Sequence, residues 1–407
     1  MKKFCACSIA SLLLVIAGCT TPPSGRALPP IGHVFIIVLE NKGFQETFGP
    51  ASPAPYLAQT LTSQGALLKN YYGTGHFSLD NYISMVSGLA PNIDTQSDCQ
   101  VFSDFVMTGL SSDGQPIGHG CVYPKHLQTI SNQLDATGRS WKAYMEDMGN
   151  DPKREVKTCG HPAIGAKDGT QRAEGPSKSV PSGDQYATRH NPFVYFHSII
   201  DEPICETHIV GFPSLKQDLN AVETTPNYAF ITPNLCHDGH DGSKERPCVN
   251  GEPGGLVSAD KFLQEVVPEV LASPAFKKDG LLIVTFDEAD IDIDYDPKTG
   301  KAVVTDADAT ACCDERPGPN IDTGKSVFGF PIRGAGIVGP GGGRIGAVLV
   351  SPFIKPGTVS AESYNHYALL RSIEDLFKLP RLGYAGQKDL KSFGSDIFTA
   401  YPGAQAP

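Results

Sequence analysis

Positive charge, tryptophan and long apolar runs are scarce in this chain of 407 residues. Lysine and arginine number 33 against 44 aspartates and glutamates, so the net charge is −11. Because phosphate backbones recruit clustered Lys and Arg, and no basic stripe is present, nucleic acid is not an expected partner. A hydrophobic content of 40% with 19% charged residues is typical of a folded globular protein. The length suffices for one large domain or two smaller ones.

The first residues have the pattern of an export signal. Two lysines precede the mostly apolar residues 9–16, a stretch too short to span a bilayer. Small residues then precede Cys19, which resembles the bacterial lipoprotein signal. We therefore expect a signal peptide at residues 1–18, a lipid anchor at Cys19 and a flexible tether at residues 19–30. The expected location is the bacterial cell envelope, on the periplasmic or outer-membrane face. A plain signal peptide with secretion is the alternative.

The eight cysteines beyond Cys19 form an even set in an exported chain, which predicts disulfides. Paired C-x-x-C spacing is absent, and this disfavours a cysteine-rich zinc site. We expect the adjacent Cys312 and Cys313 to bond to different partners, for which Cys236 and Cys248 are candidates. The four cysteines left to staple the middle of the chain are Cys99, Cys121, Cys159 and Cys205.

Strand and helix patterns alternate along the chain, which predicts an α/β fold with a doubly wound, mostly parallel sheet and helices on both faces. The strand patterns are at residues 33–39, 228–231, 281–286 and 347–351, and the helix patterns at 56–63, 78–87, 127–136, 259–271 and 365–378.

Two segments of the expected domain, residues 31–398, depart from this alternation. Residues 99–210 hold four cysteines and many Gly, Pro and Ser, with little periodicity, so we expect a disulfide-stapled cap over the carboxyl edge of the sheet. Residues 290–320 are strongly acidic, and we expect them to form a second, irregular insertion.

Two apolar strands each run directly into a pair of oxygen-bearing side chains. The strand at residues 33–39 is followed by Glu40 and Asn41, and the strand at 281–286 by Asp287 and Glu288. Such continuous apolar runs are typical of parallel strands covered on both faces, and ligands bind beyond their carboxyl ends. Four oxygen donors there indicate a divalent metal site. Ordinary strand-to-loop junctions are the alternative.

Ser78 opens a helix pattern and has two interpretations. Serine is among the best N-caps. A helix N-terminus also suits an anionic phosphate, and a hydroxyl near a metal ion loses its proton readily and can attack phosphorus.

Three further polar residues follow other elements of the predicted sheet. His237 and His240 lie in an Asp-rich loop after the strand at 228–231; they can bind metal or position a phosphoryl group, or the loop is simply solvated. His366 opens the last helix, where it is either a core residue or a hydrogen-bond donor to a substrate.

Two apparent motifs carry little weight. Residues 334–339 spell G-x-G-x-x-G, but a proline and further glycines follow instead of a helix, so nucleotide binding is not expected. Residues 287–296 imitate a calcium loop without its sixth-position Gly and twelfth-position Glu, and a solvated acidic loop is expected.

The ordered set of motifs resembles the bacterial phosphoesterase family that contains phosphatidylcholine-type phospholipase C and metal-dependent acid phosphatases, within the alkaline-phosphatase-like superfamily. The matching segments are residues 38–44 with 48–49, 78–82, 232–234, 238–241, 285–288, 344–352, 365–367 and 373–375. Each is weak alone, but the order is specific. The Asp at position 80 departs from the family, which often has Pro there.

The resemblance implies that Glu40, Asn41, Asp287 and Glu288 hold one divalent metal ion, with Ca²⁺, Mg²⁺, Mn²⁺ and Zn²⁺ as candidates. It implies that Ser78 is the nucleophile that forms a phosphoenzyme. It also implies residues that bind the phosphoryl oxygens or protonate the leaving group; these are Asn81, His240 and His366, with His76 and His237 as weaker candidates.

The sequence therefore predicts an exported hydrolase of phosphoric esters, with phosphomonoesters as the preferred substrates. A phospholipase C acting on lipid head groups is the alternative, although the single Trp141 and the lack of an amphipathic membrane helix favour the monoesterase. A non-catalytic surface lipoprotein that binds a ligand in the same cleft is the alternative from another class.

Overall fold

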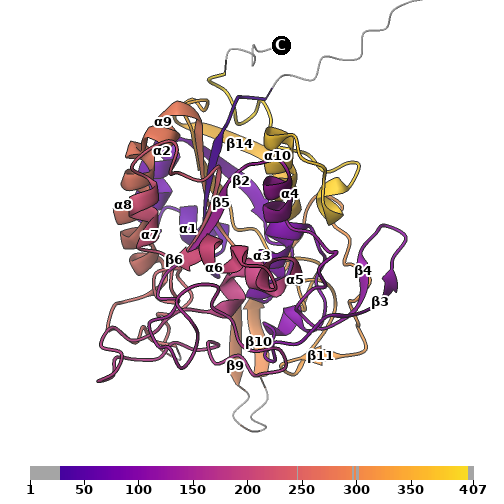
Figure 1. Cartoon of the computed structure of the whole chain (residues 1–407). Helices are drawn as coiled ribbons and strands as arrows, with labels where there is room; N and C mark the ends of the chain where they lie inside the picture. The colour runs from indigo at the N-terminus through magenta and orange to yellow at the C-terminus, as the bar shows by residue number, and fades with distance from the viewer. Residues whose placement is uncertain (1–27, 245, 296–297, 299–301, 402–407) are drawn as a thin grey trace, which may run out of the picture.

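The computed structural model describes residues 28–244, 246–295, 298 and 302–401, and its central feature is one eight-stranded sheet between two layers of helices (Figure 1). This confirms the predicted α/β class. The predicted signal peptide, the predicted anchor Cys19 and most of the predicted tether lie outside the described residues. Within the described part of the chain, we find no helix both long and apolar enough to cross a membrane.

The sheet is parallel apart from one strand. From one edge to the other its strands are β14 (Thr358–Asn365), β2 (Ala66–Tyr72), β13 (Ala347–Val350), β8 (Gly280–Phe286), β1 (His33–Leu39), β7 (Tyr228–Thr232), β5 (Trp141–Met145) and β6 (Ile209–Gly211). Only β13 runs antiparallel to its neighbours. Every residue of β1 and β8 is buried, as expected for central strands covered on both faces.

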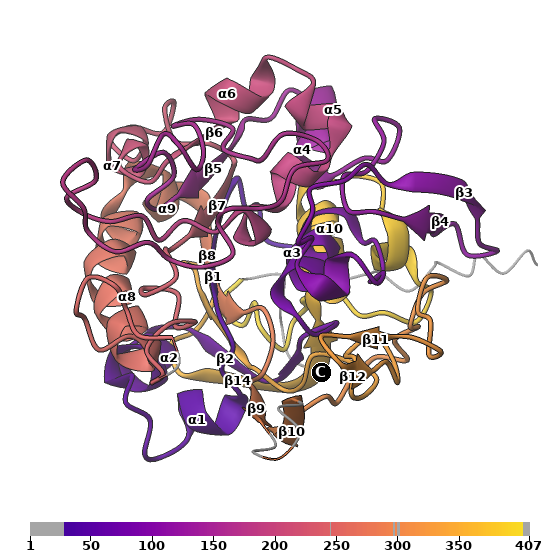
Figure 2. The ribbon, with the colours of Figure 1, turned by 90° about the horizontal axis from the view of Figure 1, so that it is seen from below.

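Helices cover both faces of the sheet, as Figure 2 shows from below. On one face lie the π-helical segment η1 (Tyr56–Leu61), α2 (Thr62–Gln64), α8 (Gly255–Ala272) and α9 (Pro274–Asp279), and on the other α3 (Ser78–Ser87), α4 (Ile130–Ala136) and α10 (His366–Phe377). The shorter helices are α1 (Phe44–Phe48), α5 (His197–Ile200), α6 (Ile204–His208) and α7 (Ser214–Asp218), and the 3₁₀ turns are η2 (Thr95–Ser97), η3 (Thr188–His190), η4 (Pro192–Tyr195) and η5 (Gly383–Gly386).

Local signals explain where the two long helices on the second face begin and end. α3 ends at Gly88, whose φ of +68° is the left-handed conformation that glycine adopts without strain. α10 begins after Asn365, whose side chain accepts a hydrogen bond from the Ala368 amide. His366 is thus the first residue of the last helix, as predicted.

Three small hairpins lie outside the main sheet: β3 (Val106–Leu110) with β4 (Pro116–His119), β9 (Ile291–Tyr295) with β10 (Ala302–Ala307), and β11 (Ser326–Val327) with β12 (Phe330–Pro331). The β9–β10 hairpin differs from the irregular insertion expected at residues 290–320. Its sequence Ile-Asp-Ile-Asp-Tyr alternates with the period of a strand, which explains the hairpin. Residues 334–339 form tight turns with no helix after them, as expected.

The cap expected at residues 99–210 also contributes to the sheet, since β5 and the start of β6 belong to it. The sequence patterns did not predict β5, because Lys142 interrupts a short apolar run. The Lys142 ammonium reaches the Asp218 carboxylate at 2.7 Å, which lets this strand carry a cation. In Figure 1 much of the remaining insertion gathers below the sheet, on the side where β9 and β10 lie.

Four disulfides close these irregular segments. Cys99–Cys121 and Cys159–Cys205 staple the insertion, as expected. The expectation for the adjacent pair was wrong, because Cys312 and Cys313 are bonded to each other. Cys236 and Cys248 already close their own loop, with a sequence separation of 12, so they are not available as partners.

We predict that the Cys159–Cys205 and Cys236–Cys248 disulfides differ in their contribution to stability. The Cys159–Cys205 bond spans 46 residues and Cys236–Cys248 spans 12, so chain-entropy arguments give about 4 and about 3 kcal/mol. Paired Cys→Ser variants, followed through guanidinium unfolding under non-reducing conditions, measure these losses. A larger loss for the short loop would contradict the ranking.

Candidate active site

The pairing of β1 with β8 brings the two predicted acidic junctions together. Leu39 is in register with Phe286, so Glu40 and Asp287 follow at the same level of adjacent strands. The Asn41 amide donates to Asp287 Oδ1 at 3.0 Å, and the Glu288 amide donates to the same oxygen at 2.6 Å. The parallel sheet thus places all four predicted metal ligands at one edge.

The first two turns of α3 deliver two hydroxyls to the carboxylate of Glu40. Ser78 Oγ donates to Glu40 Oε2 at 2.9 Å, and the Tyr82 hydroxyl donates to Oε1 at 2.7 Å. All three side chains are buried, with Ser78 only 3% exposed. The predicted nucleophile therefore lies in direct contact with a predicted metal ligand.

His190, from the insertion, completes this cluster. Its ring stacks on Tyr82, with centroids 5.2 Å apart. Its Nε2 lies 3.2 Å from Glu40 Oε1 and its Nδ1 lies 3.2 Å from Asp238 Oδ2. Asp238 follows β7, and its carbonyl accepts a hydrogen bond from the Glu40 amide at 2.8 Å. Glu40, His190 and Asp238 can each direct a ligand atom to one point, since these atoms lie within 4.8 Å of one another.

Burial of this much acid strongly disfavours negative charge. Desolvation, followed by the charges of Asp287 and Asp238, raises the pKa of Glu40 well above its ordinary value. Burial also raises the pKa of Asp287 to about 7 and that of Glu288 well above the usual range. Burial, with the charge of Arg189 next, lowers the pKa of His190. A cation among the carboxylates would favour their ionised forms.

The side chains present fit a divalent metal ion. Three buried atoms that face the cluster make no hydrogen bond within the described structure: Asp238 Oδ2, Asp287 Oδ2 and His190 Nε2. Carboxylate oxygens with one imidazole nitrogen suit Mg²⁺, Mn²⁺, Ca²⁺ or Zn²⁺. Two ligand sets are available and share Glu40: the strand-end set predicted from sequence, and the set with His190 and Asp238.

Two of the predicted histidines contact the acidic residues that follow β8. His76 Nδ1 pairs with Glu288, and its Nε2 lies 3.1 Å from the Asp308 carbonyl oxygen. His366 lies between the Tyr71 hydroxyl at 3.1 Å and the Asp287 carbonyl oxygen at 2.5 Å. Burial lowers the pKa of each histidine to about 4. Both rings are thus positioned to orient the acidic residues.

Asn81 is engaged with the loop before α3. Its Oδ1 accepts from the Thr74 and Gly75 amides at 2.8 and 3.0 Å, and its Nδ2 donates to the Gly75 carbonyl at 3.0 Å. These bonds fix the segment that leads into Ser78. The predicted contact of Asn81 with phosphoryl oxygens stays a prediction.

The remaining predicted histidines occupy different surroundings. His240 lies near the cluster, with its ring centroid 6.1 Å from that of His190. His237 instead pairs with Glu146 at 2.9 Å and with Glu252 at 3.2 Å. Burial lowers the pKa of His237, but the two glutamates outweigh burial and raise the pKa to about 9. The structure therefore brings His240 to the cluster and directs His237 to a separate pair of acids.

Sequence reasoning missed four residues of the cluster. Asp238 was part of a noted loop but was not singled out, and Tyr82 was assigned to an apolar helix face. His190 and Arg189 lie in the insertion, where no periodicity points to them. A polar Arg-His-Asn-Pro stretch between apolar segments is the one local signal they carry.

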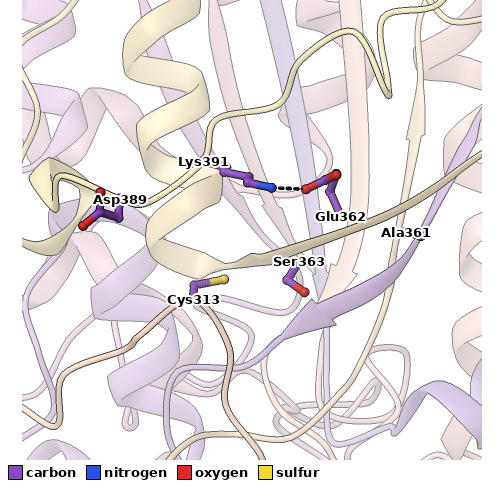
Figure 3. Close-up of a pocket in the computed structure, with 6 residues that line it drawn as sticks. All are labelled: Cys313, Ala361, Glu362, Ser363, Asp389 and Lys391. Carbon is purple, nitrogen blue, oxygen red and sulfur yellow. Dashed lines mark hydrogen bonds and ion pairs between the residues drawn. The ribbon is translucent and has the colours of Figure 1, made fainter.

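A pocket elsewhere on the molecule shares no residue with this cluster. Figure 3 shows Lys391 paired with Glu362 beside Cys313. Its lining residues are Cys313, Ala361, Glu362, Ser363, Asp389 and Lys391. None of its side chains forms part of the acidic site at the carboxyl end of β1.

Residues 50–380 match the Phosphoesterase family. A phosphate-repressible acid phosphatase from Penicillium chrysogenum is 27% identical over 347 residues, which are 85% of this chain and 59% of that protein. A phosphatidylinositol-3-phosphatase from Mycobacterium tuberculosis is 23% identical over 89% of this chain and 82% of that protein. The chain thus spans about 59% of the length of the first of these relatives.

Solved structures with related architecture are more distant. A protein in the alkaline phosphatase superfamily from Vibrio parahaemolyticus has a TM-score of 0.47 and 12% identity, over 92% of this chain and 73% of that one. Murine ectonucleotide pyrophosphatase/phosphodiesterase 5 has a TM-score of 0.46 and 11% identity, over 90% of this chain and 98% of that one.

We predict that Glu40→Gln lowers the affinity for a divalent cation by at least about 100-fold, since losing even a supporting residue costs about 10–100-fold. Equilibrium dialysis against Mg²⁺, Mn²⁺, Ca²⁺ and Zn²⁺ measures binding without reference to any activity. Glu269→Gln is the matched control, because that carboxylate is 48% exposed and pairs with Lys216. Undiminished binding by a folded Glu40→Gln variant would contradict both ligand sets.

Two further variants separate the ligand sets. If His190 and Asp238 hold the ion, Asp238→Asn weakens binding more than Glu288→Gln does. If the strand-end set holds it, the order is reversed.

Proposed function

The chain belongs to the Phosphoesterase family, and we propose that it is a metal-dependent hydrolase of phosphoric monoesters with Ser78 as its nucleophile. One observation carries the proposal: the Ser78 hydroxyl, at the first turn of α3, donates to Glu40 within a cluster that fits a divalent cation. The name of the acid phosphatase relative points to the same class of reaction.

Hydrolysis would proceed in two steps. Ser78 Oγ attacks phosphorus while the bond to the leaving-group oxygen breaks, and the proton of Ser78 passes to its hydrogen-bond partner Glu40. The phosphoryl group is then held on Ser78. Water attacks this phosphoserine in line and releases inorganic phosphate, which regenerates the serine.

Each neighbouring group has a proposed part. The metal ion would be held by Glu40 with either ligand set, and it would supply positive charge for the phosphoryl oxygens. The positive end of the α3 dipole would favour the same oxygens, while the Leu79 amide at this end is already bonded to Asp98. His240 and His366 are the predicted candidates for exchanging protons with the leaving group and the water, and either ring would have to exchange a present contact for the substrate to do so. Tyr82 holds Glu40 in place.

Because an apolar surface lies beside Ser78, esters of apolar alcohols are also candidate substrates. Phe77 immediately precedes the nucleophile, and its ring packs edge-on against Phe328 with centroids 5.1 Å apart. Phe328 is 49% exposed. This surface suits an aryl or lipid leaving group, and the phosphatidylinositol-3-phosphatase relative acts, by its name, on a lipid monoester.

We predict that Ser78→Ala lowers kcat for an aryl phosphate by about 1,000-fold or more, because the attacking oxygen is lost. Metal binding should persist in this variant. Ser87→Ala is the matched control: Ser87 is buried in the same helix, but its hydroxyl bonds to the Ile83 carbonyl at 2.7 Å. Full activity of Ser78→Ala would move the nucleophile elsewhere.

A substrate screen tests the reaction class itself. Aryl phosphates, phosphodiesters and phospholipids are offered with each divalent metal across several pH values. Preferential cleavage of monoesters supports the proposal, whereas preferential release of phosphorylated head groups supports a phospholipase C. Cleavage of none of them would leave the ligand-binding lipoprotein as the better explanation.

We also propose that the mature protein is anchored to the bacterial envelope through Cys19. We predict that Cys19→Ala transfers the protein from the membrane fraction to the soluble fraction and removes labelling by a fatty-acid analogue, since the acyl acceptor is lost. Cell fractionation with detergent-phase partitioning measures both effects. An unanchored wild-type protein would instead indicate a plain signal peptide.

A further inference from the structure

Two guanidinium groups converge on one side of His240. Arg189 Nη2 lies 3.2 Å from His240 Nε2, and Arg246 Nη1 lies 2.9 Å from the same nitrogen. Asp241 Oδ1 lies 2.8 Å from the opposite ring nitrogen, Nδ1. Guanidinium groups can only donate, so Nε2 is the acceptor of both contacts and the ring proton lies on Nδ1, facing Asp241. Nε2 then offers a single lone pair to both guanidinium groups.

Burial opposes the charge of Arg189, but nearby carboxylates, Asp98 first, outweigh it and raise its pKa, so Arg246 is the cationic donor left without an ion pair within the described structure. Two like charges beside one neutral atom repel each other. Asp98 is the ion-pair partner of Arg189, with 3.8 Å between Asp98 Oδ2 and Arg189 Nε. Arg246 has no ion-pair partner among the residues that the structure describes. Arg172 is close enough for its charge to lower the pKa of Arg246, after burial and the charge of Arg189. An anion bound here would relieve the repulsion.

The cationic group extends from the acidic cluster to the surface. Arg189 is 1% exposed and follows directly before His190 in the chain, so it belongs to the inner end. Asp98, its partner, accepts from the Leu79 amide at 3.0 Å, next to Ser78. Arg246 and Arg172 are exposed and form the outer end. A substrate whose phosphoryl group reaches Ser78 would thus direct its alcohol portion past His240.

Two contacts restrain the backbone of Arg246. The Gly242 amide donates to the Arg246 carbonyl at 2.7 Å, and the Cys236–Cys248 disulfide closes the segment around it. An ordered loop can hold a guanidinium at one position, which is what selective anion binding requires.

We propose that Arg246, with Arg189 and Arg172, binds a second anionic group on the alcohol portion of the substrate. The inference rests on the proposed monoesterase function and names its substrate class: phosphoric monoesters that carry another phosphate, such as polyol bisphosphates or phosphoinositide head groups. Guanidinium groups suit phosphate because their planar N–H donors bind two oxygens together.

The test compares two substrates that differ by one phosphate, 3-hydroxyphenyl phosphate and benzene-1,3-diyl bisphosphate. We expect the wild-type enzyme to prefer the bisphosphate in kcat/KM by about tenfold, the size of one charge-assisted hydrogen bond. Arg246→Gln should reduce this preference to near unity, and Arg246→Lys should keep part of it, because charge remains without the planar fork. Added salt should weaken the preference.

Lys216→Gln removes the same charge at a distant place, since Lys216 is 80% exposed and pairs with Glu269, and it should leave the preference unchanged. No preference in the wild-type enzyme, or an equal preference in Arg246→Gln, would overturn the inference while leaving the monoesterase intact. Failure to cleave either compound, or any other monoester, would instead reject the proposed function.

Two competitors distinguish the sources of such a group. Soluble inositol 1,3-bisphosphate and phosphatidylinositol 3-phosphate in phosphatidylcholine vesicles share the two anions, and each is added to the aryl phosphate assay. Competition that is lost in Arg246→Gln supports the proposal, and the more effective competitor identifies a soluble or a lipid substrate. Competition by neither would overturn it.

Discussion

The burial of several carboxyl groups at the carboxyl end of β1 is the constraint on which the rest of the site depends. The pairing of β1 with β8 forces Glu40 and Asp287 to the same edge, beneath layers that exclude water. Unpaired charge in such surroundings is expensive, and the raised pKa values of both groups express that cost. The surrounding structure is therefore best understood as a means of providing positive charge and hydrogen bonds to these oxygens.

Three separate parts of the chain meet this requirement. The first two turns of α3 provide the hydroxyls of Ser78 and Tyr82. The insertion provides His190, while the helix on the opposite flank provides His366 behind Asp287. A divalent cation is the component that would let all of them act together, because it would stabilise the ionised carboxylates and attract a phosphoryl group to Ser78.

The sequence predicts the parts of this site that follow from local periodicity. Residues 33–39 and 281–286 are continuous apolar runs, so their strands, their burial and the chemistry of the residues after them could be anticipated. β5 could not, because Lys142 needs Asp218, a residue distant in sequence, to be tolerated in a strand. His190 could not either, because only tertiary packing brings its irregular segment to Glu40. The connectivity of Cys312 and Cys313 depends likewise on which sulfur atoms the folded chain leaves available.

The overall acidity of the chain sharpens the question of how it would attract an anionic ester. A net charge of −11 repels phosphate at long range, but salt screens this field beyond about 8 Å under physiological conditions. Recognition must then come from short-range contacts at the site. Arg189 and Arg246 are the proposed source of such contacts, because both converge on His240 and Arg246 is exposed at the outer end. Positive charge thus lies on both sides of His240: Arg189 is buried next to the acidic cluster, and Arg246 is exposed where we propose that the substrate enters.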